Sequence, residues 1–282
     1  MHHPRERWSF PLEVAALATI LEKLCGTLET LALMTESAPL SVMAKLNWPC
    51  LREMVFYGAP LAGPFIQACF GMRCLRSLSL KINPGEHGMP PVVWSTSSTP
   101  TFPWPDLESL TVSYPDLRDE IYDYLPSTLR SLSLRCWHHQ HRQLYLFRRD
   151  MAYRPLRQCL LTSSAMLSIL RRCSMLTLEH LEVEYAADKE DDTLLQYLVT
   201  AFPSLKSLTI HRYRFITVRY GEDEVPVVSD PNVYVCACMH RSPLTVDAHR
   251  PIARTAYGAP PVEDFLGLEP ILGYGFRSCS RC

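Results

Sequence analysis

The stretch Leu129-Arg-Ser-Leu-Ser-Leu134 contains the pattern that decides the fold, L-x-x-L-x-L. Its last four residues alternate between polar and apolar side chains, which is typical of a β-strand with one buried face and one face in water. The pattern recurs along the chain with conservative replacements. Its seven copies are Leu28/Leu31/Leu33, Leu51/Met54/Phe56, Leu75/Leu78/Leu80, Leu107/Leu110/Val112, Leu129/Leu132/Leu134, Leu178/Leu181/Val183 and Leu205/Leu208/Ile210.

Successive copies begin 23, 24, 32, 22, 49 and 27 residues apart, which indicates one repeated structural unit. Most of these intervals lie near the roughly 20 to 29 residues of a leucine-rich repeat. The 49-residue interval fits either two units, one of them degenerate, or one unit with an insertion. Because a single unit cannot bury its leucines alone, neighbouring units must stack.

Helical patterns separate the strands, over Leu12–Leu24, Pro60–Phe70, Leu117–Leu125, Ser164–Cys173 and Asp192–Phe202. Residues 162–164 and 191–192 carry side-chain oxygens that can cap the first turns of two of these helices. Strand, loop and helix therefore alternate along most of the chain. We predict an α/β leucine-rich repeat solenoid, a horseshoe with parallel strands on its concave face and helices on its convex face.

The repeat signal divides the chain into two parts. Residues 1–214 are predicted to form the array of about seven repeats, with an inserted loop near 84–105 and an irregular unit over 136–177. Residues 215–282 are predicted to form a C-terminal cap and a proline-rich, poorly ordered tail. Either Phe215–Tyr220 or Val233–Val235 is expected to cover the last leucines as a short strand.

Composition excludes several classes of partner. The chain has 28 lysine and arginine residues against 29 aspartate and glutamate residues and no basic stripe, which argues against a nucleic-acid partner. No apolar run reaches the ~18 residues of a membrane span, so no membrane partner is expected. The apolar stretch Val14–Leu21 is interpreted as part of a capping helix. Eleven irregularly spaced cysteines do not form the pattern of a secreted disulfide framework, which favours an intracellular protein, cytoplasmic or nuclear.

Two longer stretches, Leu125–Trp137 and Phe202–Ile210, resemble fungal F-box/leucine-rich repeat proteins. In that family an F-box docks on the adaptor Skp1 and the repeats select a substrate for ubiquitination. Phe10-Pro-Leu-Glu-Val14 resembles the opening of an F-box, but the first repeat begins at Leu28, too early for a complete F-box before it. The resemblance implies an alternative function as the substrate-recognition subunit of an SCF-type (Skp1/cullin/F-box) ubiquitin ligase.

Strand side chains that do not enter the core should form rows across the concave face, with one residue from each repeat. Serine and threonine dominate the first two rows and suit a solvated sheet. The first row is Thr30, Glu53, Ser77, Ser109, Ser131, His180 and Ser207, and the second is Ala32, Val55, Ser79, Thr111, Ser133, Glu182 and Thr209. The third row is Met34, Tyr57, Lys81, Ser113, Arg135, Glu184 and His211. It carries large polar side chains, which are typical of protein interfaces. From this row and the neighbouring Glu182 we predict a site for a protein partner that consists of Tyr57, Lys81, Arg135, Glu182, Glu184 and His211.

Signals for catalysis are weak. The sequence has no glycine-rich phosphate loop, no nucleophile elbow and no H-E-x-x-H motif, so we expect a protein that is not an enzyme and needs no cofactor. The competing hypothesis is a zinc site in the tail, because thiolates and imidazoles are the ligands that zinc prefers. Its candidate ligands are Cys236, Cys238, His240, His249, Cys279 and Cys282.

Overall fold

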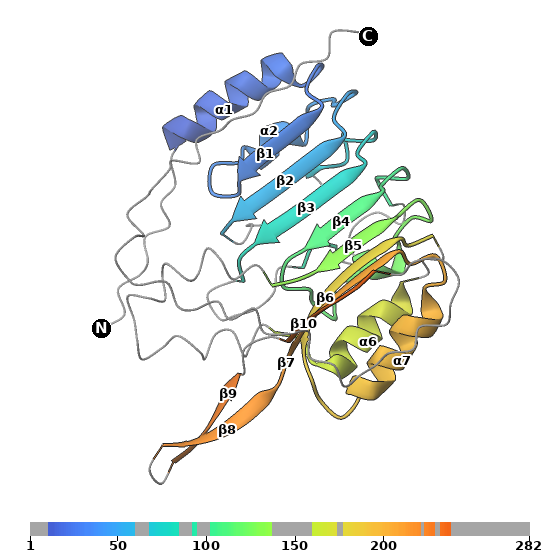
Figure 1. Cartoon of the computed structure of the whole chain (residues 1–282). Helices are drawn as coiled ribbons and strands as arrows, with labels where there is room; N and C mark the ends of the chain where they lie inside the picture. The colour runs from blue at the N-terminus through green and yellow to red at the C-terminus, as the bar shows by residue number, and fades with distance from the viewer. Residues whose placement is uncertain are drawn as a thin grey trace, which may run out of the picture.

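Seven parallel strands form the body of a single sheet in the computed structural model (Figure 1). The structure describes residues 11–59, 68–84, 92–94, 102–136, 160–173, 177–220, 223–228 and 232–237. The strands follow chain order and each contains one copy of the repeated pattern. They are β1 (Thr30–Met34), β2 (Glu53–Gly58), β3 (Ser77–Ile82), β4 (Ser109–Val112), β5 (Ser131–Leu134), β6 (His180–Ala186) and β7 (Ser207–Tyr213).

Equivalent residues of neighbouring copies face one another along the whole sheet. Leu132 of β5, for example, pairs with Leu110 on one side and Leu181 on the other. The strands and their register are therefore as the sequence predicts. Because β5 pairs directly with β6, no strand lies between them in this sheet, which favours one unit with an insertion over two units.

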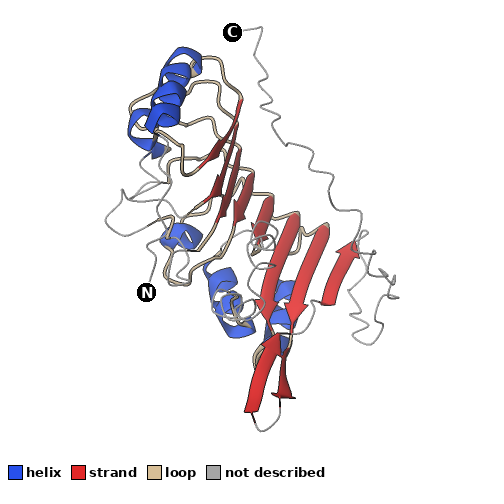
Figure 2. Cartoon of the chain, turned by 90° about the vertical axis from the view of Figure 1, so that its left-hand side faces the viewer, coloured by secondary structure: helices blue, strands red, loops and turns tan. Residues whose placement is uncertain are grey.

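Most helices lie on one side of this sheet (Figure 2). They are α2 (Leu40–Met43), the 3-10 helix η1 (Glu120–Asp123), α6 (Ser163–Arg172) and α7 (Asp191–Ala201), whereas α1 (Pro11–Leu24) lies beside the edge strand β1. Among the described residues, no helix covers the opposite side, which we call the open face. The chain thus has an α/β, solenoid-like architecture with a parallel sheet as its framework.

The repeated apolar side chains supply most of the core. All of them are buried except Leu205, which is partly buried. Two tryptophans that the pattern does not include extend this core, Trp48 and Trp104, each three residues before the first leucine of a copy. Their indole nitrogens donate to the carbonyl oxygens of Met43 at 3.2 Å and Cys69 at 3.3 Å, so these large side chains bury no unpaired donor.

A shared carbonyl joins each copy to the next. The carbonyl oxygen of Glu29 accepts hydrogen bonds from the amides of Arg52 at 2.8 Å and Glu53 at 3.0 Å. Equivalent pairs of amides bond to equivalent carbonyls at every step up to Ser207, including the step across the long insertion. Although the intervals between copies differ in length, each next strand therefore begins at the equivalent position beside the preceding strand.

The helix predicted over Leu117–Leu125 is wrong, because only the short η1 forms there. The carboxylate of Asp119 caps η1 through the Ile121 amide at 3.0 Å, and it also accepts from the amides of Val93 at 2.6 Å and Trp94 at 3.0 Å. Asp119 thus holds the segment after β4 against the inserted loop. Its complete burial raises the pKa of this carboxyl to about 6.

The inserted loop contributes aromatic side chains to the core. Trp94 is buried and stacks on Phe102 and Tyr124, with ring centroids 5.8 and 5.6 Å apart, respectively. The described part of the insertion is therefore a loop, as predicted, but one that is anchored by large apolar contacts.

The other predicted helices have mixed outcomes. α1, α6 and α7 form within one residue of their predicted ends, and Thr162 caps α6 through the Ala165 amide. The capping role predicted for Asp191 and Asp192 is wrong, because Glu190 stands at the start of α7 and no side chain caps it. The carboxylate of Asp191 pairs with Arg212 instead. Most of the predicted helix over Pro60–Phe70 lies outside the described residues.

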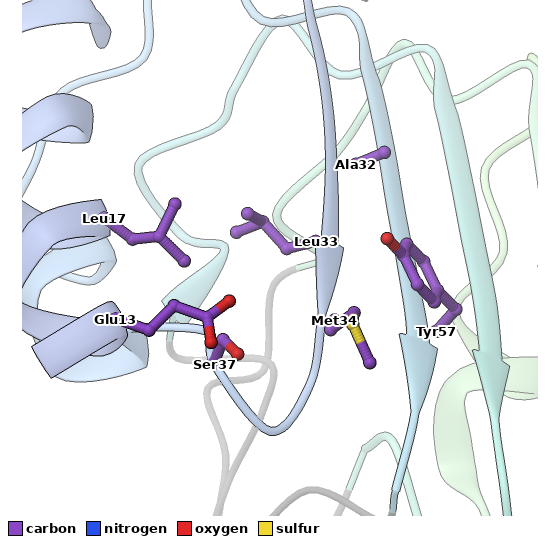
Figure 3. Close-up of a pocket in the computed structure, with 7 residues that line it drawn as sticks. All are labelled: Glu13, Leu17, Ala32, Leu33, Met34, Ser37 and Tyr57. Atoms are coloured by element: carbon purple, nitrogen blue, oxygen red, sulfur yellow. The ribbon is translucent and has the colours of Figure 1, made fainter. Parts of the chain in front are cut away.

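The two ends of the sheet are covered differently. At one end α1 lies beside β1 and buries Leu21, as expected of a capping helix (Figures 1 and 3). At the other end β10 (Asn232–Ala237) pairs antiparallel with β7, so Val233–Val235 forms the predicted covering strand. The alternative, Phe215–Tyr220, forms β8 and pairs with β9 (Asp223–Val228) in a separate two-stranded sheet.

Replacement of a repeated leucine in the middle of the stack should destabilise it strongly. We predict that Leu132→Ala lowers the free energy of unfolding by about 2 to 5 kcal/mol, because Leu132 is 1% exposed and its truncation leaves a cavity. The neighbouring Ser131→Ala on the open face should change it by less than about 0.5 kcal/mol. Urea denaturation of both variants measures the difference, and equal costs would contradict the assigned register.

Candidate functional site

The open face brings the six predicted site residues together in two groups rather than one. Tyr57 and Lys81 lie opposite each other on β2 and β3. Arg135, Glu182, Glu184 and His211 gather at the other end, on β6 and β7 and just after β5. The register of the parallel strands places these residues along the predicted third row, except Glu182, which lies in the neighbouring second row.

Glu182 is the centre of the second group. Its Oε2 accepts from Ser133 Oγ at 2.7 Å, while its Oε1 accepts from Arg135 Nη1 at 3.1 Å and lies 2.9 Å from His211 Nε2. The pKa of Glu182 is lowered to about 2, mainly by the hydrogen bond with His211. Partial burial raises this pKa, but the hydrogen bond from Ser133 and the charge of Arg135 lower it further. Glu182 is therefore ionised at any physiological pH.

Glu184 lies deeper in the same group. Tyr213 donates its hydroxyl hydrogen to Glu184 Oε1 at 2.6 Å, and Arg135 Nε lies 3.9 Å from the other carboxylate oxygen. Burial, followed by the charge of Glu184, raises the pKa of the Tyr213 hydroxyl. We call the residues that share these contacts the charged cluster, Ser133, Arg135, Glu182, Glu184, His211 and Tyr213.

The prediction that the whole third row is exposed is wrong for two of the site residues. Glu184 is 2% and His211 8% exposed, because the other members of the charged cluster pack against them. The side chains of Arg135 and Glu182 remain about one quarter exposed, at 26% and 27%. Arg135 and Glu182 can therefore contact a partner, whereas Glu184 and His211 orient them.

Tyr57 lies beside a pocket at the opposite end of the sheet, between α1 and the first two strands (Figure 3). Leu17 of α1 and Leu33 of β1 point toward one another there, and Met34 is 45% exposed. The pocket is lined by Glu13, Leu17, Ala32, Leu33, Met34, Ser37 and Tyr57. This end of the open face therefore carries apolar side chains next to the polar Thr30 and Glu53.

Half-buried hydroxyl side chains occupy the middle of the open face. They belong to the first two rows, as predicted, and are Ser77, Ser79, Ser109, Thr111 and Ser131. The chemistry of the open face thus changes along the stack, from mixed apolar and polar side chains over β1 and β2, through hydroxyl groups, to charged over β6 and β7.

Sequence analysis overlooked a row of charged residues directly before the strands. Every copy has one after its first leucine, at Glu29, Arg52, Arg76, Glu108, Arg130, Glu179 and Lys206. Neighbouring members form ion pairs, with Arg130 and Lys206 at 3.3 and 2.7 Å from the carboxylate of Glu179. Because these pairs are solvent-exposed, each contributes little to stability. An alignment of the seven copies would have revealed the row.

No metal centre is evident in the part of the chain that the structure describes, where no three histidine, cysteine or acidic side chains come together suitably. Of the alternative zinc ligands, Cys236 lies in β10 and the other five lie outside the described residues. None of the described helices has the length and apolar character that crossing a membrane requires.

Comparisons of the chain with family models, with curated proteins and with solved structures give no match. Functional inference therefore depends on the fold and on the open face.

Removal of the charge at the centre of the cluster should destabilise the protein in a pH-dependent way. We predict that Glu182→Gln lowers the free energy of unfolding at pH 7 by about 1 to 3 kcal/mol, since it weakens the bonds with Arg135 and His211. The pKa of Glu182 is depressed in the folded state. Its negative charge therefore stabilises the fold fully at pH values above the ordinary glutamate pKa of ~4.3, and this stabilisation is lost as the pH falls toward about 2.

The matched control is Glu53→Gln, an exposed glutamate on the first row, which should change stability by less than about 0.5 kcal/mol. Urea titrations of both variants between pH 2 and pH 7 make the comparison. If the loss in the free energy of unfolding caused by Glu182→Gln does not shrink as the pH falls, the charge of Glu182 does not stabilise the fold.

Proposed function

We propose that this chain is a leucine-rich repeat protein without catalytic activity that binds another protein on its open face. The observation that carries this proposal is a seven-stranded parallel sheet with one side that no helix of the described residues covers. Its register brings large polar side chains from distant parts of the sequence into one row. We further propose that it acts inside the cell, which agrees with its many thiols and near-neutral charge.

The size of the open face suits such a role. With a spacing of ~4.8 Å between strands, seven strands extend over about 29 Å. A standard protein interface buries about 800 Å² on each partner, which corresponds to a patch about 28 Å on a side. One partner could therefore contact the end at β1 and β2, the hydroxyl rows and the charged cluster together.

The exposed members of the predicted site have suitable chemistry for contacts of this kind. Tyr57 offers a flat aromatic ring and Arg135 a planar guanidinium, two groups that are enriched at interface hot spots. Lys81 and Glu182 add charges of opposite sign. The buried Glu184 and His211 restrain Arg135 and Glu182, so less side-chain entropy is lost when a partner binds.

Substitutions on the open face should abolish partner binding. We predict that Tyr57→Ala combined with Lys81→Ala, and separately Arg135→Gln, each weaken the affinity at least about tenfold. Affinity capture with mass spectrometry would identify a partner, and titration calorimetry with the purified pair would give the dissociation constants.

The control is a variant with Ser168→Ala and Gln196→Ala, which changes exposed positions of α6 and α7 on the helical side. It should bind as the unmodified chain does. If open-face and helical-side variants bind equally well, or lose binding equally, the open face is not the interface. Circular dichroism confirms that each variant is folded.

The second candidate function is that of an SCF substrate receptor, which rests on the resemblance to F-box/leucine-rich repeat proteins. One structural observation favours a contact through α1, because Leu12 and Ile20 are 87% and 43% exposed there. We predict that purified Skp1 binds the chain if this function is correct, and that Leu12→Asp with Ile20→Asp abolishes binding while the buried Leu21 keeps α1 in place. Absence of binding in a pull-down with the unmodified chain would reject this candidate.

A further inference from the structure

Two cysteines occupy the same place in successive copies of the repeat. Cys50 directly precedes Leu51, and Cys74 directly precedes Leu75, the first leucines of the second and third copies. Cys74 is exposed and Cys50 is half-buried, in contrast to the fully buried core thiols of Cys69 and Cys173. Both equivalent thiols are therefore within reach of a small reagent in solution.

Contacts on both sides of these cysteines show that the two main chains run next to each other. After them, the carbonyl oxygen of Arg52 accepts from the amides of Arg76 at 2.8 Å and Ser77 at 2.9 Å. Before them, the amide of Trp48 donates to the carbonyl oxygen of Gly71 at 3.4 Å. Cys50 and Cys74 each lie three residues before the strands β2 and β3. The ~4.8 Å between neighbouring strands lies within the roughly 4.4 to 6.8 Å between the Cα atoms of disulfide-bonded cysteines.

Later copies show where a side chain at this position points. In the fifth copy, the residue directly before the first leucine is Thr128. Its Oγ1 donates to the carbonyl oxygens of Pro105 and Leu107, both at 2.9 Å. These carbonyls flank Asp106, the equivalent residue of the fourth copy. Thr177 of the sixth copy likewise contacts the carbonyls on either side of Thr128. The γ atom at this position thus points back over the equivalent residue of the preceding copy.

We propose that Cys50 and Cys74 form a reversible disulfide that links the second and third repeats when the cell contains enough of a low-molecular-weight disulfide such as glutathione disulfide. The stacking of the main chains brings the two residues together, and the repeated side-chain direction aims Cys74 at Cys50. The link would join the starts of β2 and β3, the strands that carry Tyr57 and Lys81.

The chemistry is a thiol–disulfide exchange in two steps. The thiolate of the exposed Cys74 attacks one sulfur of glutathione disulfide, forms a mixed disulfide and releases one glutathione. The sulfur of Cys50 then attacks the Cys74 sulfur and releases the second glutathione. Two protein thiols and one glutathione disulfide thus give one protein disulfide and two glutathione molecules, which carry away both thiol protons.

Equilibration of the full chain in glutathione buffers tests the proposal. After acid quenching, alkylation and tryptic digestion, the peptide of residues 46–52 should be linked to that of residues 74–76. The mass should fall by two hydrogen atoms, and the melting temperature should rise by roughly 5 to 10 °C. The experiment is run on the unmodified chain and on a variant with serine in place of Cys159, Cys236, Cys238, Cys279 and Cys282, so that these five thiols cannot exchange with the pair. The variant keeps the partly buried Cys25 and the buried Cys69, Cys136 and Cys173.

A Cys74→Ser variant provides the matched control, because it leaves Cys50 with Cys25, which lies two residues before the equivalent position in the first copy. This variant should form no internal link and should take up glutathione at Cys50 instead. In the protein that keeps both Cys50 and Cys74, addition of urea before equilibration should reduce the disulfide-linked fraction at least about tenfold. The reason is that unfolding lowers the local concentration of one thiol near the other. Glutathione on Cys74 without an internal link, or equal linkage in folded and unfolded protein, would overturn the proposal.

Discussion

The shared carbonyl at the start of each strand is the contact on which the arrangement of the molecule depends. Two amides of the following copy bond to it at each of the steps from Glu29 to Ser207. This contact fixes where the next strand begins, so its leucines stack on those of the previous copy and its polar side chains continue the same rows. The loops between strands can then differ in length, since only their ends are constrained.

The pattern of leucines was sufficient to predict the strands because a period of two assigns each residue to one face of the sheet. Leu78, Leu110 and Leu132 are buried in register, and the rows across the open face follow from the same alternation. The pattern could not predict how far each row is exposed. Exposure of Glu184 depends on Tyr213 and Arg135, which come from neighbouring strands and pack against it.

The segment before β5 shows a second limit of sequence analysis. Its apolar spacing over Leu117–Leu125 is compatible with a helix, but the backbone is held by contacts with residues far away in the sequence. Asp119 bonds to the amides of Val93 and Trp94, and the guanidinium of Arg172 donates to the carbonyl oxygens of Leu117 and Asp119. Such tertiary hydrogen bonds override local helix propensity, and no local pattern indicates them.

The antiparallel strand β10 determines where the stack stops. A parallel sheet that ended at β7 would present an unpaired row of amides and carbonyls, onto which the first strand of another molecule could add in the same direction. β10 occupies that edge with reversed polarity, while α1 lies beside the opposite edge at β1. Among the described residues, neither edge of the parallel sheet is left without a neighbouring element, an arrangement that disfavours the addition of further molecules edge to edge.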